Sequence, residues 1–203
     1  MAQETDWKLR TARRHPDGKR RCAWCGDDPL YVEYHDREWG RPVHDEHRLF
    51  EMLCLEGAQA GLSWITVLRK RDSYRRAFAG FDAHKMARFG AAQRARLMQD
   101  AGIVRNRLKI EAFIGNARAL LDLHERGATL DETLWQFTGG RTLKRRPLRL
   151  ADFRASSPQS DAMSKELKRL GFRFVGSTIC HAFMQAVGMM DEHQRHCWAA
   201  KVD

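Results

Sequence analysis

Apolar residues recur at helical spacing in segment after segment of this 203-residue chain. The clearest example is Asn106–His124, where apolar side chains lie three or four residues apart and Gly127 closes the segment. No stretch alternates between apolar and polar residues for long enough to support a sheet. The sequence therefore predicts an all-α fold.

Capping residues divide this pattern into separate helices. Asp45 is a plausible N-cap for a helix that we expect to break at Gly57–Gly61, and Ser63 can cap a second helix that continues to Phe78. Further helices are expected after Pro29 and Asp82, over 91–98, 106–124, 130–137 and 163–170, and from the caps Ser177 and Thr178.

The length and charge of the chain narrow the class of protein. A chain of this length can bury a real core, and we expect one domain over 22–203. Lys and Arg outnumber Asp and Glu by 36 to 26, a net charge of +10, which favours a polyanionic partner such as nucleic acid. We expect no membrane span, no signal peptide and a cytoplasmic location, because no apolar run is long enough. The five cysteines are then buried thiols or metal ligands rather than disulfides.

Residues 1–21 are polar and strongly basic, with few large apolar side chains, Trp7 among them. We expect a mobile arm, which either adds affinity for phosphate or only solvates the chain end.

Cys54–Trp64 places a carboxylate, two glycines and an indole between two predicted helices. Glu56 is the first candidate for a functional residue, because a carboxylate at the end of an apolar run needs a reason to be there. The alternative is a solvated Glu56 at a helix end with Trp64 in an ordinary core.

The segment Cys22–Gly40 is dense in aromatic residues although it is rich in charge. If a helix starts at Pro29, then Tyr31, Tyr34 and His35 share one of its faces. The aromatic side chains here form either a hydrophobic cap or the walls of a base-stacking slot.

Two helices joined by a short hairpin with glycines at Gly171 and Gly176 are typical of a helix-hairpin-helix. Its backbone N–H groups and the N-terminus of its second helix, near Ser177, can bind a phosphate, with Lys168 at the flank. The basic loop Arg141–Arg149 is either a solvated connection or a further contact with DNA.

Cysteines and histidines gather near both ends of the sequence. Cys22 and His35 lie near the start, and His193 and Cys197 lie near the end, spaced so that one helical face could carry both. Two Cys and two His form a tetrahedral zinc set that would clip the chain ends together. Cys25 and His196 are competing ligands, and spacing alone does not decide among them.

Three long motifs resemble bacterial DNA-3-methyladenine glycosylase I. They are Asp28-Pro-Leu-Tyr-x-x-Tyr-His-Asp-x-Glu-Trp-Gly40, Leu49-Phe-Glu-Met-x-Cys-Leu-Glu-Gly-x-Gln-Ala-Gly-Leu-Ser-Trp-Ile-Thr-Val-Leu68 and Ser164-Lys-x-Leu-Lys-x-x-Gly-Phe-x-Phe-Val-Gly-Ser-Thr-Ile-Cys180. The resemblance runs in order from about Cys22 to Cys197. It implies an all-helical helix-hairpin-helix repair enzyme that flips 3-methyladenine out of double-stranded DNA and hydrolyses its N-glycosidic bond.

The resemblance also implies roles for individual residues. Structural zinc falls on Cys22, His35, His193 and Cys197, which leaves Cys25 and His196 as bystanders. Base binding falls on Tyr31, Tyr34, Trp39, Glu56 and Trp64, with Glu56 as the catalytic carboxylate, and the loop that enters the gap in the DNA falls on Gly61 and Leu62. We expect a monomer that releases free 3-methyladenine.

The chemistry suits these residue types. Methylation at N3 makes the base cationic and a good leaving group, so the enzyme has mainly to extrude and hold a cation. Aromatic faces and a carboxylate do this, and no lysine stands out as a Schiff-base nucleophile. A catalytic Asp191 is the less favoured interpretation because Asp191 adjoins the predicted ligand His193. The alternative function is a noncatalytic protein that binds DNA lesions.

Overall fold

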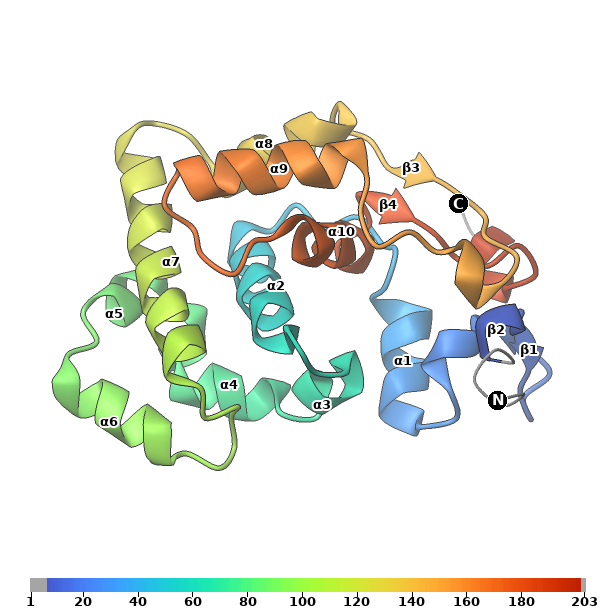
Figure 1. Ribbon diagram of the computed structural model, residues 1–203, viewed down its shortest axis with the longest axis horizontal. Coiled ribbons are helices and arrows are strands. Elements are labelled where there is room, and N and C mark those ends of the chain that lie inside the picture. Colours follow the sequence, from blue (N-terminus) through green and yellow to red (C-terminus); the bar gives the residue numbers. More distant parts are fainter. Residues whose placement is uncertain (1–6, 202–203) are drawn as a thin grey trace. The chain divides into compact units, whose positions relative to one another are not determined.

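The computed structural model describes residues 7–201 and is mostly helical, as predicted. Its α-helices are α1 (Pro29–Arg37), α2 (Glu46–Gln59), α3 (Trp64–Leu68), α4 (Arg71–Ala77), α5 (Ala83–Ala87), α6 (Ala91–Gln99), α7 (Arg107–Glu125), α8 (Leu130–Trp135), α9 (Pro158–Arg169) and α10 (Ser177–Ala186) (Figure 1). Short 3-10 helices are η1 (Trp7–Leu9), η2 (Ala23–Cys25), η3 (Ala79–Phe81), η4 (Gln136–Thr138), η5 (Leu150–Asp152) and η6 (Trp198–Lys201).

The chain divides into two compact units. Unit 1 comprises the chain up to Pro42, Arg141–Ala155 and the chain from Met184, and unit 2 comprises Val43–Gly140 and Ser156–Phe183. The single domain expected over 22–203 stays a prediction. No helix within residues 7–201 is both long enough and apolar enough to cross a membrane.

Two predicted caps, Asp45 and Asp82, are confirmed. The Asp45 side chain accepts a hydrogen bond from the Arg48 backbone N–H at 2.8 Å at the start of α2. Asp82, Asn106 and Ser157 cap α5, α7 and α9 in the same way, each through the third residue that follows. These polar side chains satisfy backbone N–H groups that a helix leaves unpaired in its first turn.

One predicted helix boundary is confirmed and another is wrong. Helix α2 ends at Gln59, inside the break expected at Gly57–Gly61, although Gly57 itself is helical and packs so tightly that an added Cβ would lie 3.2 Å from the Phe174 Cβ. The helix expected from Ser63 to Phe78 is split into α3 and α4, because the chain turns at Arg69 and Lys70.

Unit 2 has an aromatic core. Phe78, Phe81 and Phe113 are almost fully buried, and Phe78 lies 4.8 Å from Phe113 between ring centroids. Helix α7 contacts α2, α5 and α6, and α2 also contacts α3 and α8. The periodic apolar face of α7 therefore packs against several helices of this unit. The unit also contains α2 and the hairpin between α9 and α10 (Figure 1).

Unit 1 joins segments from both halves of the sequence. β1 (Arg13–Arg14) pairs antiparallel with β2 (Arg20–Arg21), and β3 (Leu143–Lys144) pairs parallel with β4 (Met190–Asp191). These two-residue strands are the only strands among the described residues, too short to change the all-α class. The β3–β4 pair aligns Lys144 with Asp191, two residues before the predicted ligand His193.

Part of the predicted arm belongs to this unit. Residues 1–6 of the arm lie outside the described residues. The Arg21 side chain is buried and contacts Asp17 and Asp36 at 2.6 and 2.7 Å, and the Arg10 carbonyl accepts a hydrogen bond from Leu150 N–H at 3.0 Å. The mobility of the arm and its affinity for phosphate stay predictions.

Candidate active site and metal centre

Glu56 lies near the end of α2 with only 3% of its surface exposed. Its Oε2 has no hydrogen-bond partner among the described residues. Burial raises the pKa of Glu56 from 4.5 to about 8, because the carboxylate loses its solvation and no cation compensates. The interpretation of Glu56 as a solvated residue at a helix end is therefore wrong. A carboxyl group kept in this state is typical of functional sites.

The segment after Glu56 presents two different surfaces. Trp64, the first residue of α3, is buried with 7% exposure, whereas Leu62 on the preceding turn is 40% exposed. Gly61 adopts a φ of +79° with open space around its Cα. The turn thus places an exposed apolar side chain on a tight bend, which suits insertion into an opened base stack.

An aromatic cluster in unit 1 contains the other three residues predicted to bind the base. Tyr31 and Tyr34 lie 6.4 Å apart between ring centroids, and Tyr34 and Trp39 are buried. Trp24 joins them, with its ring 5.1 Å from Tyr31 and 4.9 Å from Trp39. The sequence analysis did not select Trp24, although its place in the aromatic-rich segment was a signal for it.

Three of the four predicted metal ligands come together in unit 1. The ligand atoms of Cys22, His35 and Cys197 all lie within 4.8 Å of one another, and all three residues are buried. Cys197 Sγ is 3.4 Å from His35 Nε2. The cluster joins the N- and C-terminal segments of the chain and could hold a metal ion.

The surroundings of this cluster fit a cation. His193 lies beside it, with its ring 5.1 Å from that of His35 between centroids and nearly perpendicular to it. His193 Nε2 is buried without a hydrogen-bond partner in the described chain. Gly40 makes room for this ring, because a Cβ at Gly40 would lie 2.8 Å from His193 Cε1. Two thiols, an imidazole and a second imidazole with an orphaned nitrogen form a donor set suited to zinc.

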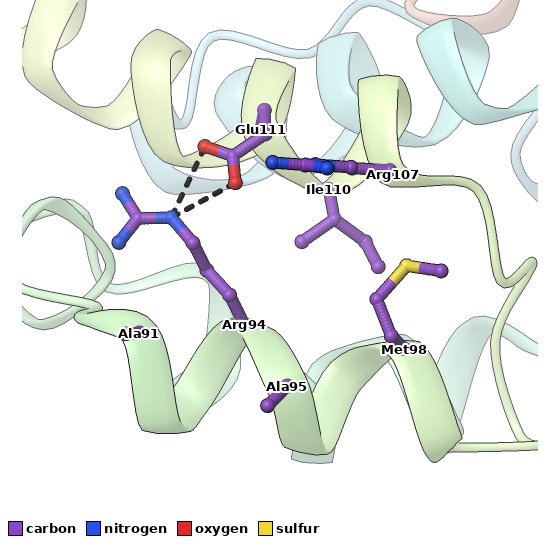
Figure 2. Close-up of a pocket in the computed structure, with 7 residues that line it drawn as sticks. All are labelled: Ala91, Arg94, Ala95, Met98, Arg107, Ile110 and Glu111. Atoms are coloured by element: carbon purple, nitrogen blue, oxygen red, sulfur yellow. Dashed lines mark hydrogen bonds and ion pairs between the residues drawn. The ribbon is translucent and has the colours of Figure 1, made fainter.

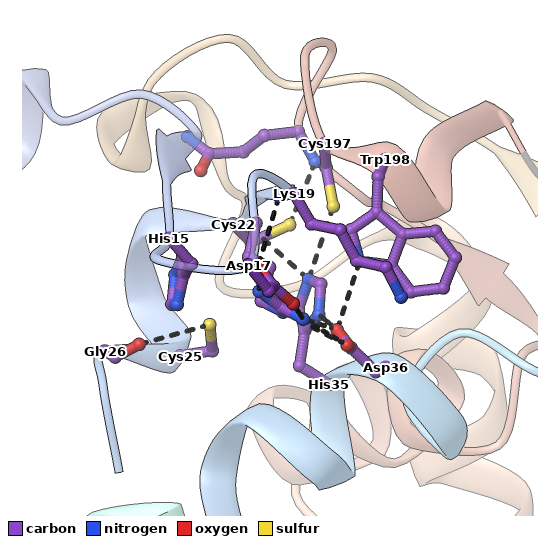
Figure 3. Close-up of polar contacts among 12 residues, drawn as sticks. His15, Asp17, Lys19, Cys22, Cys25, Gly26, His35, Asp36, Cys197 and Trp198 are labelled. Atoms are coloured by element: carbon purple, nitrogen blue, oxygen red, sulfur yellow. Dashed lines mark hydrogen bonds and ion pairs between the residues drawn. The ribbon is translucent and has the colours of Figure 1, made fainter. Parts of the chain in front are cut away.

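Carboxylates orient both imidazoles, and Figure 3 shows the pair formed by His35 and Asp36. His35 Nδ1 donates to Asp36 Oδ1 at 2.8 Å, and His193 Nδ1 donates to Asp191 Oδ1 at 2.7 Å. Burial alone would raise the pKa of Asp36, but hydrogen bonds from Arg21, His35 and Trp198 lower it to about 2. Each histidine therefore keeps its Nε2 for a ligand bond, as is common around protein-bound metals.

The structure separates the Cys22, His35 and Cys197 cluster from the competing residues Cys25 and His196. Cys25 is buried, but its Sγ contacts the Gly26 carbonyl oxygen at 3.6 Å and does not belong to the cluster, and His196 is exposed. His193 and Cys197 do not share a helical face, because the chain is irregular between β4 and η6. Tertiary folding, rather than i, i+4 spacing, places them.

The Asp191 carboxylate is hydrogen-bonded to two neighbouring side chains. Besides His193, its carboxylate accepts a hydrogen bond from Arg146 Nη2 at 2.6 Å. Burial alone would raise the pKa of Asp191, but the hydrogen bonds from His193 and Arg146 lower it to about 2. These contacts explain the position of Asp191 without a catalytic role. They also show that Arg146, and with it part of the basic loop, is more than a solvated connection.

The predicted hairpin joins α9 and α10, where the chain reverses direction (Figure 1). Gly171 has a φ of +92°, a conformation that favours glycine. Lys168 and Gly171 are exposed. Ser177 is the first residue of α10 rather than its cap, and its hydroxyl hydrogen-bonds the Asp161 carboxylate and Ser160 Oγ.

A surface pocket of about 400 Å³ lies between α6 and α7 (Figure 2). Arg94 on α6 pairs with Glu111 on α7, with 3.0 Å between Arg94 Nε and Glu111 Oε1. None of the predicted site residues lines this pocket, so it is separate from the site proposed from the sequence.

Comparisons with known proteins show the family of this chain. The methyladenine glycosylase family model matches residues 24–200. The chain is 50% identical over 177 residues to DNA-3-methyladenine glycosylase 1 of Escherichia coli (strain K12), covering 87% of this chain and 95% of that protein. A crystal structure of 3-methyladenine DNA glycosylase I has a TM-score of 0.86 at 48% identity, covering 88% of this chain and 98% of that chain. The enzyme from Staphylococcus aureus, solved to explain 3-methyladenine recognition, has a TM-score of 0.85 at 34% identity, covering 89% of this chain and 96% of that chain.

The mostly helical fold is thus that of 3-methyladenine DNA glycosylase I structures. With its buried carboxylate and its Cys and His cluster, it defines a helical DNA repair enzyme. The chain belongs to the methyladenine glycosylase family.

Proposed function

We propose that this protein removes 3-methyladenine from alkylated DNA by hydrolysing the N-glycosidic bond, without cutting the strand. Membership of the family supports the reaction and the substrate. The single observation that carries the mechanism is Glu56, a fully enclosed carboxyl group whose pKa is raised to about 8 by burial.

A cationic base is the ligand that such a carboxyl group selects. In the free protein near pH 7 Glu56 is mostly protonated, because its pKa lies above that pH. A cation placed beside it would lower its pKa and draw it into the ionised form. Neutral adenine offers no such compensation, so the carboxyl group discriminates between the damaged and the normal base by charge.

The bond then breaks with little acid catalysis. The departing base takes the electron pair of the glycosidic bond, which neutralises its positive charge. Water adds to the sugar C1′ and releases a proton to the solvent. The protein contributes mainly by extruding the nucleotide, which costs a few kcal/mol, and by holding the base. Hydrolysis by this route needs no lysine nucleophile, as expected for a monofunctional glycosylase.

On the strength of the family resemblance, we assign aromatic contacts with the base to Tyr31, Tyr34, Trp39 and Trp64. Each face can contribute cation–π attraction of roughly 0.5 to 2 kcal/mol when water is excluded. Trp24 is added to this set, because its ring contacts those of Tyr31 and Trp39.

We assign the entry into the duplex to Gly61 and Leu62, supported by the exposed side chain of Leu62 on a tight turn. The hairpin would bind a phosphate through Gly171, Gly176 and Ser177, with Lys168 as a neighbouring cation. The exposure of Lys168 and Gly171 is compatible with that role.

We also propose that the metal is a structural zinc ion held by Cys22, His35, His193 and Cys197. Bound zinc would tie the two chain ends of unit 1 together and has no part in the reaction. The orphaned Nε2 of His193 supports its assignment as the fourth ligand.

Excision from methylated DNA, with the released bases identified, tests this proposal. Release of free 3-methyladenine supports it. Binding of methylated duplex without release would favour the alternative, a noncatalytic protein that binds DNA lesions. We further propose that the protein acts as a monomer in the cytoplasm, where its DNA substrate would be found.

A further inference from the structure

Lys109 on α7 is an unusual lysine, because only 8% of its surface is exposed. Its Nζ donates hydrogen bonds to the carbonyl oxygens of Ala58 and Ala60, both at 2.7 Å. These carbonyls lie at the C-terminal end of α2, where a cation also interacts favourably with the helix dipole. Lys109 therefore holds the turn that leads from Glu56 to Gly61 and Leu62.

A second polar side chain of α7 holds the hairpin. Asn116 is buried, its Nδ2 donates to the Arg173 carbonyl oxygen at 3.1 Å, and its Oδ1 accepts from the Arg173 backbone N–H at 2.8 Å. The next residue, Phe174, has a positive φ of 56° and packs against Gly57. Asn116 thus fixes the backbone of the hairpin beside a strained residue.

Lys109 and Asn116 lie seven residues apart, two turns of α7, and so point from nearly the same face about 10 Å apart along the axis. Lys109 hydrogen-bonds the end of α2, and Asn116 hydrogen-bonds the hairpin between α9 and α10.

We propose that Lys109 and Asn116 are positioning residues through which α7 sets the spacing between the loop that enters the DNA and the hairpin that binds its phosphate. The inference rests on the DNA-binding roles proposed above for Gly61, Leu62 and the hairpin. Neither side chain touches the DNA in this arrangement. Correct spacing would let both loops engage one duplex without further adjustment.

The test compares Lys109→Met with the wild-type protein on a duplex that carries a tetrahydrofuran abasic analogue. We expect affinity to fall about tenfold, because two hydrogen bonds from a charged group are lost and the loop is no longer held. Binding of free 3-methyladenine should stay within about twofold, since Glu56 and Trp64 are untouched. The slope of log affinity against log salt should not change, because Lys109 contacts no phosphate.

Lys70→Met is the matched control. Lys70 Nζ also donates to a backbone carbonyl, that of Ala101, at 2.7 Å, but this contact is exposed and holds neither the end of α2 nor the hairpin. Its loss should leave affinity for the abasic duplex unchanged. An equal loss in Lys70→Met and Lys109→Met would overturn the proposal, because it would show a general effect on stability.

Asn116→Ala provides a second variant should Lys109→Met fail to fold. It should lower affinity for duplexes with and without the abasic analogue, while free 3-methyladenine still binds normally. Unchanged DNA affinity in either folded variant would overturn the proposal. A slope of log affinity against log salt that is smaller in magnitude by about 0.9 in Lys109→Met would also overturn it, because it would show that a direct phosphate contact is lost. Failure of wild-type protein to release 3-methyladenine would instead refute the proposed function, since the DNA-binding comparison needs no turnover.

Discussion

Replacing Glu56 by Gln is expected to stabilise the folded protein at neutral pH while it weakens recognition of the damaged base. Glu56 is 3% exposed, and its Oε2 is without a hydrogen-bond partner within residues 7–201. Its ionised form therefore has little compensation for the water it loses. Gln keeps nearly the same shape but cannot ionise.

The pKa of Glu56 sets the size of the effect. The folded protein holds this proton up to about pH 8, whereas the unfolded chain releases it near 4.5. Because the folded state binds more protons between these values, its stability falls as the pH rises through them. At about 1.36 kcal/mol for each pH unit, the loss of folding stability caused by Glu56 reaches about 3 kcal/mol at pH 7 but only about 1 kcal/mol at pH 5. Glu56→Gln removes this loss.

Guanidinium unfolding of both proteins at pH 5 and pH 7 measures this difference directly. The free energy of unfolding of Glu56→Gln minus that of wild type should be about 2 to 3 kcal/mol larger at pH 7 than at pH 5. All other titrating groups are shared and cancel. The same variant should bind 3-methyladenine more weakly and excise it more slowly.

Glu51→Gln is the control, because Glu51 is a buried glutamate on the same helix whose Oε1 accepts from Arg75 Nε at 2.8 Å. Its replacement removes an ion pair and should destabilise the protein at pH 7. If Glu56→Gln changed the free energy of unfolding equally at pH 5 and pH 7, the carboxyl group would not be desolvated, and the reasoning about the site would fail.

Three further predictions concern the metal centre and the DNA contacts. Cys197→Ser, or removal of the metal by a chelator, should lower the melting temperature by more than about 5 °C; a wild-type protein that contains no zinc by metal analysis would remove this explanation. Asp191→Asn should keep the excision rate within about threefold of wild type and weaken zinc binding about 10-fold or more, because His193 loses its orienting partner. A large loss of rate at full metal occupancy would instead indicate a catalytic Asp191. Leu62→Ala should slow excision from duplex DNA and leave binding of free 3-methyladenine unchanged; equal losses in both assays would place Leu62 at the base rather than in the duplex.

Local signals in the sequence predicted most of the helices. Helices begin at Asp45, Asp82 and Asn106 as expected, because a cap and the apolar spacing that follows it act over a few residues. The break expected at Gly57–Gly61 is confirmed by the end of α2 at Gln59, although Gly57 itself stays helical. Glycine is a weak helix former, but here close packing against Phe174 in the folded chain overrides that preference.

The sequence by itself determined the helical class, the caps at Asp45 and Asp82 and, through long motifs, the family. Residue spacing alone left open which cysteines and histidines gather, which only the family resemblance assigned, and whether Glu56 meets water. Only the tertiary structure brought Cys22, His35 and Cys197 together, with Cys25 and His196 outside their cluster, and enclosed the carboxyl group of Glu56. The reason is that burial and ligand geometry depend on which distant segments pack together, and no local spacing encodes that.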